Sequence, residues 1–239
     1  MKIIDAIWEK RNLGVDTVEF IVEYNDDETV VNEILEAEKQ YNVVKLPMNK
    51  PRLMVRLQEN GYFFVECIVS IQHNLSETKM AAARRLRLFD TQSIRMDEHD
   101  IQVLYNELEK AVFSTDRIYN DMFFPEGTSA RRYRNWIDDE LMRGSVLYKL
   151  VYRNAAVGFF IMEQMDNKVF NTFLIGLYDG YQNKGLGQSL AFSILTECIA
   201  QGAKRAIGSV STNNLAMLKV DELLGYEIKD IKYVFIKHK

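Results

Sequence analysis

Two hydrophobic patterns succeed one another along the chain. Alternating apolar and polar residues predict strands, because successive side chains of a strand face opposite sides, and apolar residues three to four positions apart predict helices. The alternating runs place strands at 16–24, 43–46, 62–71, 91–96, 146–153, 156–164, 170–178, 205–210 and 228–237. The helical spacing covers 28–40, 51–60, 99–113, 129–142, 184–201 and 214–224. A hairpin followed by alternating strands and helices predicts an α/β fold with a mixed sheet.

A polar and basic stretch at 74–90 interrupts these patterns. Such a change of composition between two patterned regions is typical of a linker between domains. We therefore expect a smaller α/β domain at 1–75, a connector at 76–90 that is helical through 79–88, and a larger domain at 91–239.

The two ends of the chain also resemble each other at an offset of 164 residues. A strand, a helix and a Gly-Tyr pair within 43–62 correspond to the same series within 207–226. Gly61 and Gly225 stand where the C-terminal cap of a helix needs a positive φ angle. Residues 1–72 are thereby predicted to be a half-domain built on the plan of the C-terminal half. Coincidence between two ordinary β-α-β units is the competing interpretation.

Composition narrows the class of protein. The 239 residues are 47% hydrophobic and 27% charged, which is the range of globular proteins. The net charge of −4 argues against a nucleic-acid binder. No apolar run reaches the roughly 18 residues of a membrane span. The N-terminus lacks the apolar core of a signal peptide, so we expect a soluble cytoplasmic protein.

Cysteine and histidine show no spacing that suits a disulfide or a metal. Cys67 and Cys198 lie far apart within apolar segments and are predicted to be buried, reduced thiols. The three histidines are scattered without ligand spacing. No metal is therefore expected.

The segment after the strand at 170–178 carries the clearest chemical signal. A short loop leads into Gln182-Asn183-Lys184-Gly185-Leu186-Gly187-Gln188 and an amphipathic helix. The first N–H groups of a helix have no partner within it and lie at the positive end of the helix dipole. Glycines there let a bulky anion approach the main chain, so the loop predicts a pyrophosphate site. The spacing matches neither the dinucleotide-binding fingerprint nor the ATP-binding loop.

The elements after this loop strengthen the signal. A helix, a strand, Asn214 at the start of a second helix, and Gly225 before the last strand follow in order. With 182–187 matching a Gln/Arg-x-x-Gly-x-Gly/Ala motif, residues 91–239 resemble the GNAT superfamily of N-acetyltransferases. The resemblance implies the GNAT fold, a mixed and mostly antiparallel sheet flanked by helices. It also implies acetyl-CoA as cosubstrate, bound by residues 182–188 and Asn214. Main-chain groups near Ile175 and Leu177 would polarise the thioester and hold the pantetheine arm.

A narrower resemblance covers nearly the whole chain. Segments at 12–16, 57–62, 113–119 and 130–137 look like those of the dTDP-fucosamine acetyltransferase group, in which a truncated GNAT-like domain precedes the catalytic one. The resemblance implies a nucleotide-linked amino sugar as acceptor. Arginines suit phosphate oxygens and aromatic rings stack on bases. The predicted substrate-binding residues are Arg117, Tyr119 and Tyr133. Some of these side chains would instead form a solvated helix face with its core anchors.

The expected proton donor departs from the family. Many members carry a tyrosine seven residues after the helix-start asparagine, where this chain has Asp221. A carboxyl group with its ordinary pKa near 4 is a poor proton donor for a thiolate with a pKa near 8–9. Asp221 and Tyr178 are both candidates, and we expect Asp221 to be exposed and ionised. Further candidates are Tyr181, Tyr226 and water as donors, and Glu163 and Asp166 as bases.

Two other functions stay open at this point. The enzyme could acetylate another amine, such as a polyamine, an amino acid or a protein N-terminus. Alternatively, the chain could be an acyl-CoA-binding module that lost its chemistry, as Asp221 in place of tyrosine would allow. The expected partner is a small-molecule amine rather than a nucleic acid or a membrane, and a homodimer is an assembly that the sequence allows.

Overall fold

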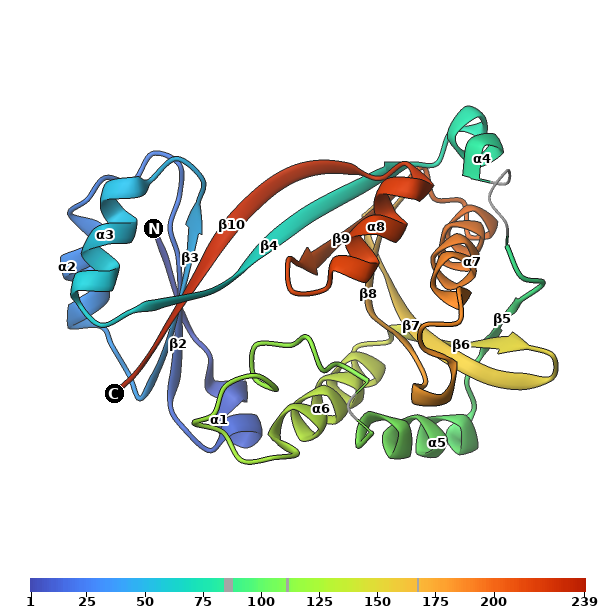
Figure 1. Cartoon of the computed structure of the whole chain (residues 1–239), viewed down its shortest axis with the longest axis horizontal. Helices are drawn as coiled ribbons and strands as arrows, with labels where there is room; N and C mark the ends of the chain where they lie inside the picture. The colour runs from blue at the N-terminus through green and yellow to red at the C-terminus, as the bar shows by residue number, and fades with distance from the viewer. Residues whose placement is uncertain (84–87, 111, 167) are drawn as a thin grey trace.

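The computed structural model describes residues 1–83, 88–110, 112–166 and 168–239, which form one ten-stranded sheet with helices packed against it (Figure 1). The strand order is β1-β2-β3-β10-β4-β9-β8-β7-β6-β5. The strands are β1 (Lys2–Asp5), β2 (Thr17–Ile21), β3 (Tyr41–Pro47), β4 (Phe63–Asn74), β5 (Gln92–Arg95), β6 (Val146–Tyr152), β7 (Ala155–Asp166), β8 (Val169–Leu177), β9 (Arg205–Ser211) and β10 (Glu227–His238). The helices are α1 (Ile7–Leu13), α2 (Val30–Glu36), α3 (Pro51–Glu59), α4 (Glu77–Ala83), α5 (Glu98–Leu108), α6 (Thr128–Met142), α7 (Leu186–Ala200) and α8 (Leu215–Leu224), with a 3₁₀ turn at Asp179–Tyr181. The β2–β3 and β8–β9 pairs are parallel and the other pairs antiparallel, which confirms the predicted mixed α/β fold.

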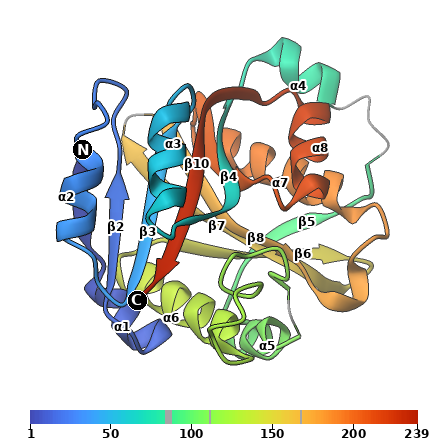
Figure 2. The ribbon, with the colours of Figure 1, turned by 60° about the vertical axis from the view of Figure 1, so that its left-hand side comes forward.

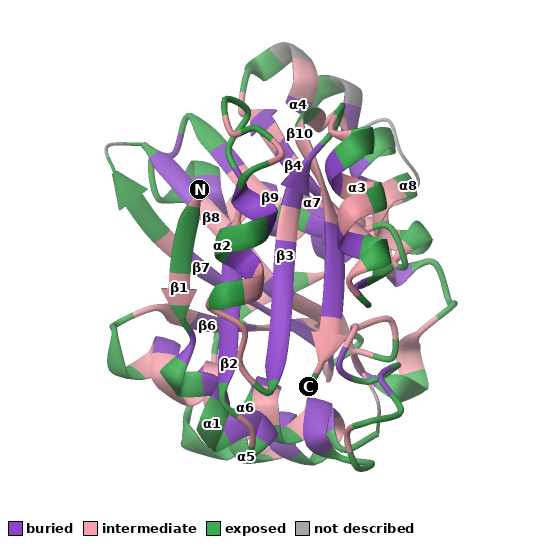
Figure 3. Ribbon diagram, turned by 90° about the vertical axis from the view of Figure 1, so that its left-hand side faces the viewer, coloured by how far each residue is buried: buried purple, intermediate pink, exposed green. Residues whose placement is uncertain are grey.

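Different helices cover the two faces of the sheet. Phe160 of β7 packs with Leu190 and Ile194 of α7, whereas its neighbour Phe159 packs with Leu104 of α5 on the other face. Burying both faces explains why the middle of β7 is a continuous apolar run. In Figure 2, α1, α6 and α5 follow one another along one side of the molecule. Figure 3 shows that β2 and β3 are likewise buried along most of their length.

The expected elements lie within a few residues of the observed ones, apart from three differences. β1 and α1 were not expected, because four and seven residues are too short for a period to be visible. The helix expected at 99–113 ends at Leu108, where no glycine or proline marks the end. The connector helix is α4, and residues 84–87 of the expected helix lie outside the described residues.

The register of the strands confirms the internal resemblance at an offset of 164 residues. The β3-α3-β4 and β9-α8-β10 units have the same order of elements. Pro47 lies opposite Lys232 in the β3–β10 pair, and their equivalents, Ser211 and Ile68, lie opposite each other in the β4–β9 pair. A coincidence between two ordinary β-α-β units would not reproduce the register.

The central β4–β10 pair lies on the approximate twofold axis between the two copies. Its bulges fall at Val65 and Lys229, which are equivalent residues, and Ile68 lies opposite its own equivalent, Lys232. In Figure 1 the two strands run side by side from α2 and α3 toward α7 and α8. Because β10 lies between β3 and β4, the two copies share one sheet. The division of the chain into 1–75, 76–90 and 91–239 stays a prediction.

Candidate active site

β8 and β9 separate partway along the sheet. They pair in parallel only where 169–171 meet 205–207, although β8 continues to Leu177 and β9 to Ser211. Beyond these pairs, the facing edges of both strands lack a strand partner and the sheet opens. In the equivalent place of the first half, β2 and β3 stay paired over the whole of β2. The gap is therefore a feature of the C-terminal copy.

A β-bulge lies on the edge of this gap. The register between β7 and β8 shifts so that Leu174 and Ile175 together oppose one residue of β7. Leu174 has a φ angle of 49°, which is uncommon for a residue other than glycine. Bulges leave a residue unpaired and change the direction of backbone groups, often beside active sites. Ile175 and Leu177 both pack against the core of the α7 face, and of the two only Ile175 belongs to the described lining of the gap.

The predicted pyrophosphate loop leads from the end of β8 into α7. Gly185 is the N-terminal cap of α7 with a φ angle of 80°, and among the described residues no side chain caps the first turn. Gln182 Nε2 donates to the carbonyl of Leu177 at 3.3 Å, and Lys184 Nζ donates to the carbonyl of Gly180 at 2.5 Å. These two bonds fix the loop and leave the N–H groups of the helix start available for an anion.

The surroundings of Gly187 show whether the loop has room for a bulky ligand. Among the described residues, a Cβ atom at this position would meet Val220 alone, at the ordinary contact distance of 3.8 Å. Packing within the chain therefore does not require glycine here, and the missing side chain leaves the main chain of the first turn open. The side chain of Leu186 is buried in the core, so only its backbone can take part. The loop fits the pyrophosphate of acetyl-CoA.

Asn183 and Gln188 belong to the same loop and first turn, whereas Asn214 lies at the start of α8. Asn183 adopts a φ angle of 58° just before the helix, and Gln188 is half-buried in the first turn. Asn214 caps α8 by accepting a hydrogen bond from the Met217 N–H at 3.1 Å, and it lines the gap. Their contacts with acetyl-CoA stay a prediction.

A cleft of about 560 Å³ runs through the gap and reaches both faces of the sheet. Consecutive residues of β9 from Gly208 to Ser211 all line it, although their side chains alternate between the faces. On the cofactor side, the face of α7 and α8, the lining includes Ile71, Ala191, Ile194, Asn214, Met217, Asp221 and Tyr226. The opposite side, here termed the acceptor chamber, is lined by Glu19, Lys45, Glu66, Phe113, Asp116, Arg117, Arg132, Tyr133, Trp136, Glu140, Glu163, Phe173 and Lys232.

Asp221 is buried on the cofactor side. The residue is 3% exposed, and neither carboxyl oxygen has a hydrogen-bond donor among the described residues. Burial raises its pKa from 3.8 to about 7, because water no longer stabilises the ionised form. The expectation of an exposed, fully ionised carboxylate is therefore wrong. α8 packs against α7 with this part of its surface turned inward, which the spacing from Asn214 alone did not reveal.

The structure separates the two predicted proton donors. Tyr178 packs in the core of the other face, with its ring 6.3 Å from that of Phe159, and lies outside the described lining of the cleft. Tyr226 lines the cleft with Asp221. Burial, and secondarily the charge of Asp221, raises the pKa of Tyr226, so its hydroxyl keeps its proton at neutral pH.

Aromatic rings form one wall of the acceptor chamber. Phe113 and Tyr133 stack with ring centroids 4.0 Å apart, Tyr133 and Trp136 lie 6.2 Å apart, and Trp136 and Phe173 lie 5.9 Å apart. Of the predicted substrate-binding residues, Tyr133 belongs to this wall and Arg117 lines the same chamber. Tyr119 is 51% exposed and lies outside the described lining of the cleft.

The first half of the chain supplies charged residues to the chamber. Lys45 Nζ donates to Glu19 at 2.7 Å across β2 and β3. Burial alone would raise the pKa of Glu19, but Lys45 and Arg117 together lower it. Glu66 of β4 also lines the chamber. The sequence analysis did not identify Glu19, Lys45 or Glu66 as site residues. Glu19 was the usable signal, because it stands between Val18 and Phe20 in an apolar strand and a buried charge needs a partner.

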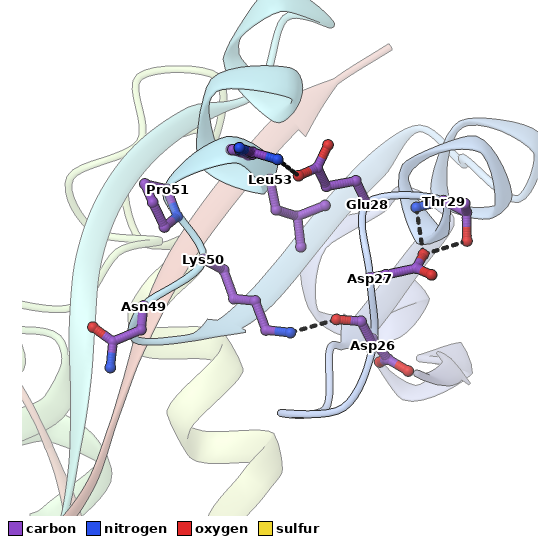
Figure 4. A pocket seen from close by; sticks show the side chains of 9 residues that line it. Asp26, Asp27, Glu28, Thr29, Asn49, Lys50, Pro51 and Leu53 are labelled. Atoms are coloured by element: carbon purple, nitrogen blue, oxygen red, sulfur yellow. Dashed lines mark hydrogen bonds and ion pairs between the residues drawn. The ribbon is translucent and has the colours of Figure 1, made fainter.

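The first half has its own pocket in the place equivalent to the cofactor loop. It measures about 520 Å³ and lies at the starts of α2 and α3 (Figure 4). Lys50, the equivalent of Asn214, donates from Nζ to the carbonyl of Tyr24 at 2.7 Å and to the carbonyl of Asp26. Asp27 and Glu28 also line the pocket, and residues 22–30 contain no glycine. Acidic side chains and a loop already bound by Lys50 do not suit a pyrophosphate.

Comparison with protein families agrees with this geometry. Residues 111–226 match the sequence model of the acetyltransferase (GNAT) family. The matched segment includes the bulge of β8, the loop at the start of α7 and Asp221. This part of the chain belongs to the GNAT acetyltransferase family, whose typical cosubstrate is acetyl-CoA.

Solved structures share the fold over nearly the whole chain. A conserved protein of unknown function from Staphylococcus epidermidis ATCC 12228 has 13% identity and a TM-score of 0.66, covering 97% of this chain and 88% of its own. A tandem GNAT protein from the clavulanic acid biosynthesis pathway has 13% identity and a TM-score of 0.57, with coverages of 93% and 75%. A GCN5-related N-acetyltransferase from Kribbella flavida has 14% identity and a TM-score of 0.53, with coverages of 93% and 81%. At these identities the likeness concerns the fold alone.

The finer predictions gain no such support. A comparison with curated protein sequences finds no match, and nothing supports the dTDP-fucosamine group in particular. Within the described ranges, no helix has the length and apolar character needed to cross a bilayer. The same residues contain no group of three or more His, Cys, Asp or Glu side chains placed to hold a metal ion, and the absence of a metal stays a prediction.

Replacing Gly187 with valine is expected to abolish acetyl-CoA binding while the protein stays folded. The new side chain would project into the space proposed for the pyrophosphate, and it has room beside Val220. Isothermal titration with acetyl-CoA measures the loss. Gly180→Val is the matched control, since nothing lies within 4 Å of a Cβ at that position of the same loop. Unchanged acetyl-CoA affinity in a folded Gly187→Val protein would remove the loop from the cofactor site.

Asp221 is expected to make the protein less stable as pH rises from about 4 to about 7. The raised pKa means that the folded state holds a proton that the unfolded state releases, so the free energy of unfolding falls across this window and levels off above it. At about 1.4 kcal/mol per pH unit, the loss is about 4 kcal/mol. Urea unfolding at several pH values should show this slope in the wild type and in Glu222→Gln, an exposed neighbour, but not in Asp221→Asn. Equal slopes in the three proteins would show that Asp221 does not titrate as a buried group.

Proposed function

We propose that this protein transfers the acetyl group of acetyl-CoA to the primary amine of a small molecule bound in the acceptor chamber, with Asp221 as proton donor. The observation that carries this proposal is the cleft through the sheet, which runs from residues of α7 and α8 on one face to a charged and aromatic chamber on the other. The cofactor loop leads directly into α7. Acetyl-CoA supplies an activated acetyl group, so the site must take a proton from the attacking amine and deliver one to the sulfur.

Asp221 has the properties of the donor. It lies on the cofactor side, seven residues and about two helical turns after Asn214, so both residues share one face of α8. With a pKa raised to about 7, Asp221 keeps a protonated fraction at neutral pH that an aspartate with its ordinary pKa lacks. Transfer of that proton to a thiolate with a pKa of about 8–9 is favourable. An ordinary aspartate, fully ionised at this pH, could not supply it.

Glu163 is the carboxylate best placed to accept the proton of the amine. It lies on β7 opposite Asn171, the last residue of β8 that pairs with β9, and it lines the chamber. Asp166, the other predicted base, is exposed and lies outside the described lining of the cleft. A base at the point where the strands separate and an acid on the cofactor side would serve the two proton transfers from opposite faces of the sheet.

A nucleotide-linked amino sugar is the second candidate acceptor. The aromatic wall from Phe113 to Phe173 favours it, because nucleobases stack on such rings. The charges of the chamber weigh against it. Arg132 is bound to Glu9 at 2.7 Å, and Arg117 stands beside carboxylates that would repel a diphosphate. We therefore favour a small amine without a nucleotide.

The test is the release of CoA thiol from acetyl-CoA in the presence of an amine panel. The panel holds diamines, polyamines, diamino acids, a peptide with a free N-terminus and a dTDP-amino sugar. We expect amine-dependent release with a small cationic amine. Release only with the dTDP-amino sugar would favour the nucleotide candidate. Binding of acetyl-CoA without release for any amine would indicate the non-catalytic module instead.

A further inference from the structure

Arg117 and Glu66 face each other in the acceptor chamber without a hydrogen bond between them. Arg117 Nη1 lies 3.7 Å from Glu66 Oε1, and Nη2 lies 3.6 Å from Glu19 Oε1. Both distances exceed those of an N–H···O hydrogen bond. The Arg117 Nε–H is buried and has no acceptor among the described residues. Only 12% of the Arg117 side chain and 4% of the Glu66 side chain are exposed.

Neighbouring charge pairs are bonded much more closely. Lys45 donates to Glu19 at 2.7 Å, and Arg132 donates to Glu9 from Nε at 2.8 Å and from Nη2 at 2.7 Å. A buried charged group is costly unless hydrogen bonds replace its hydration. The loose Arg117–Glu66 pair therefore leaves donors and acceptors that a bound molecule can satisfy.

The unsatisfied groups define the charge of that molecule. The planar fork of Arg117 matches a carboxylate, and the carboxylate of Glu66 matches an ammonium. An anion alone would leave Glu66 without a hydrogen-bond donor and would be repelled by its carboxylate. A cation alone would leave Arg117 without an acceptor and would be repelled by its guanidinium. Because the two side chains lie only 3.7 Å apart, the ligand must carry both charges on groups attached to the same carbon atom.

We propose that Arg117 and Glu66 bind the head group of an α-amino acid, with its carboxylate on Arg117 and its α-ammonium on Glu66. A nucleotide-linked amino sugar does not meet this requirement, because its amine and its diphosphate lie on different parts of the molecule. Glu66 belongs to the first half of the chain, which thereby selects the acceptor for the catalytic half.

The position of Glu66 also specifies which amine reacts. Glu66 lies two residues along β4 from Ile68, which is opposite Ser211 at the end of β9. That is about 7 Å along the strand, with a further strand spacing of about 5 Å to β9, so the main chain of Glu66 lies beyond the open end of the gap and its head-group site lies at one end of the cleft. The reacting amine must then be at the end of a side chain. This step rests on the proposed function and makes the acceptor a diamino acid acetylated on its side-chain nitrogen.

Titration of the wild-type protein with matched probes tests the head-group site without relying on turnover. L-lysine, L-ornithine and L-2,4-diaminobutyrate carry the full head group, cadaverine is lysine without the carboxylate, and 6-aminohexanoate is lysine without the α-amine. With acetyl-CoA bound beforehand, we expect at least one diamino acid to bind more than tenfold tighter than both truncated probes. If cadaverine bound as tightly as the diamino acids, the site would recognise a cation alone and the proposal of a head-group site would be wrong. Failure of all three diamino acids to bind at 10 mM would also overturn the proposal.

Two variants separate the roles of the pair. Glu66→Gln should weaken the diamino acid more than tenfold and leave 6-aminohexanoate unchanged, whereas Arg117→Lys should weaken the diamino acid and leave cadaverine unchanged. Thermal unfolding and acetyl-CoA affinity check that both variants fold. A diamino acid that binds but is not acetylated would contradict the proposed function alone, and acetylation of simple diamines in preference to diamino acids would contradict the head-group site alone.

Discussion

Replacing Asp221 with asparagine is expected to lower kcat by about 10²–10⁴-fold, the usual loss when a general acid is removed. Asparagine keeps the size of the side chain but carries no proton that can titrate, while the cofactor loop at the start of α7 is untouched. The wild-type rate should also fall above the pKa of about 7, because the ionised carboxylate cannot donate, and the variant should lose this limb. Steady-state kinetics from pH 6 to 9, with acetyl-CoA affinity measured separately, check both effects.

Glu222→Gln is the control for this experiment, since it removes a carboxylate from the adjacent, exposed position of the same helix. Its kcat should stay within about twofold of the wild type. A drop of less than tenfold in Asp221→Asn, with the alkaline limb retained, would assign the proton transfer to Tyr226 or to water. Tyr226→Phe would then distinguish these two.

Replacing Arg132 with alanine is expected to destabilise the protein by about 3–5 kcal/mol, the cost of leaving a buried charge without its partner. Arg132 of α6 donates to Glu9 of α1 through both Nε and Nη2, and the two side chains are 13% and 3% exposed. The pair joins the first half of the chain to α6, the helix that carries Tyr133 and Trp136 of the aromatic wall. Urea unfolding of the full chain measures the change.

Arg11→Ala is the matched control, because it breaks another ion pair between the same two helices. Arg11 Nη2 lies 2.7 Å from Asp139, but the Arg11 side chain is 49% exposed. Exposed pairs contribute at most about 1 kcal/mol. A similar loss of unfolding free energy in Arg132→Ala and Arg11→Ala would mean that the burial of Glu9 does not make the Arg132–Glu9 pair more important than an exposed pair.

The loop and the helix starts on the cofactor side were predictable because their signals are local. A strand, a glycine-containing loop and a helix start are adjacent in the sequence, and the φ angle of Gly185 and the cap at Asn214 depend on a few neighbouring residues. The resemblance between the two copies was visible in the sequence for the same reason, whereas their register came from the structure. Periodicity located nearly all of the elements for the same reason.

The proton donor and the acceptor chamber were not predictable in this way. Whether Asp221 is buried depends on how α8 packs against α7, and helical spacing defines a face without saying what covers it. The chamber joins residues more than 90 positions apart, such as Glu19 and Arg117, so no sequence window contains both. Long-range pairing of strands creates this proximity, and only the folded chain shows it.

The place of β10 between β3 and β4 has a consequence for biosynthesis. Residues 1–74 emerge from the ribosome with β3 and β4 each lacking the neighbour that lies between them in the sheet. That neighbour is the final strand, more than 150 residues later, and at about 5–20 residues per second it arrives roughly 10–30 s afterwards. During this time the nascent chain exposes strand edges that invite pairing with other chains. We therefore expect slower translation, or fewer chaperones, to lower the yield of folded protein before it lowers the activity of the molecules that fold.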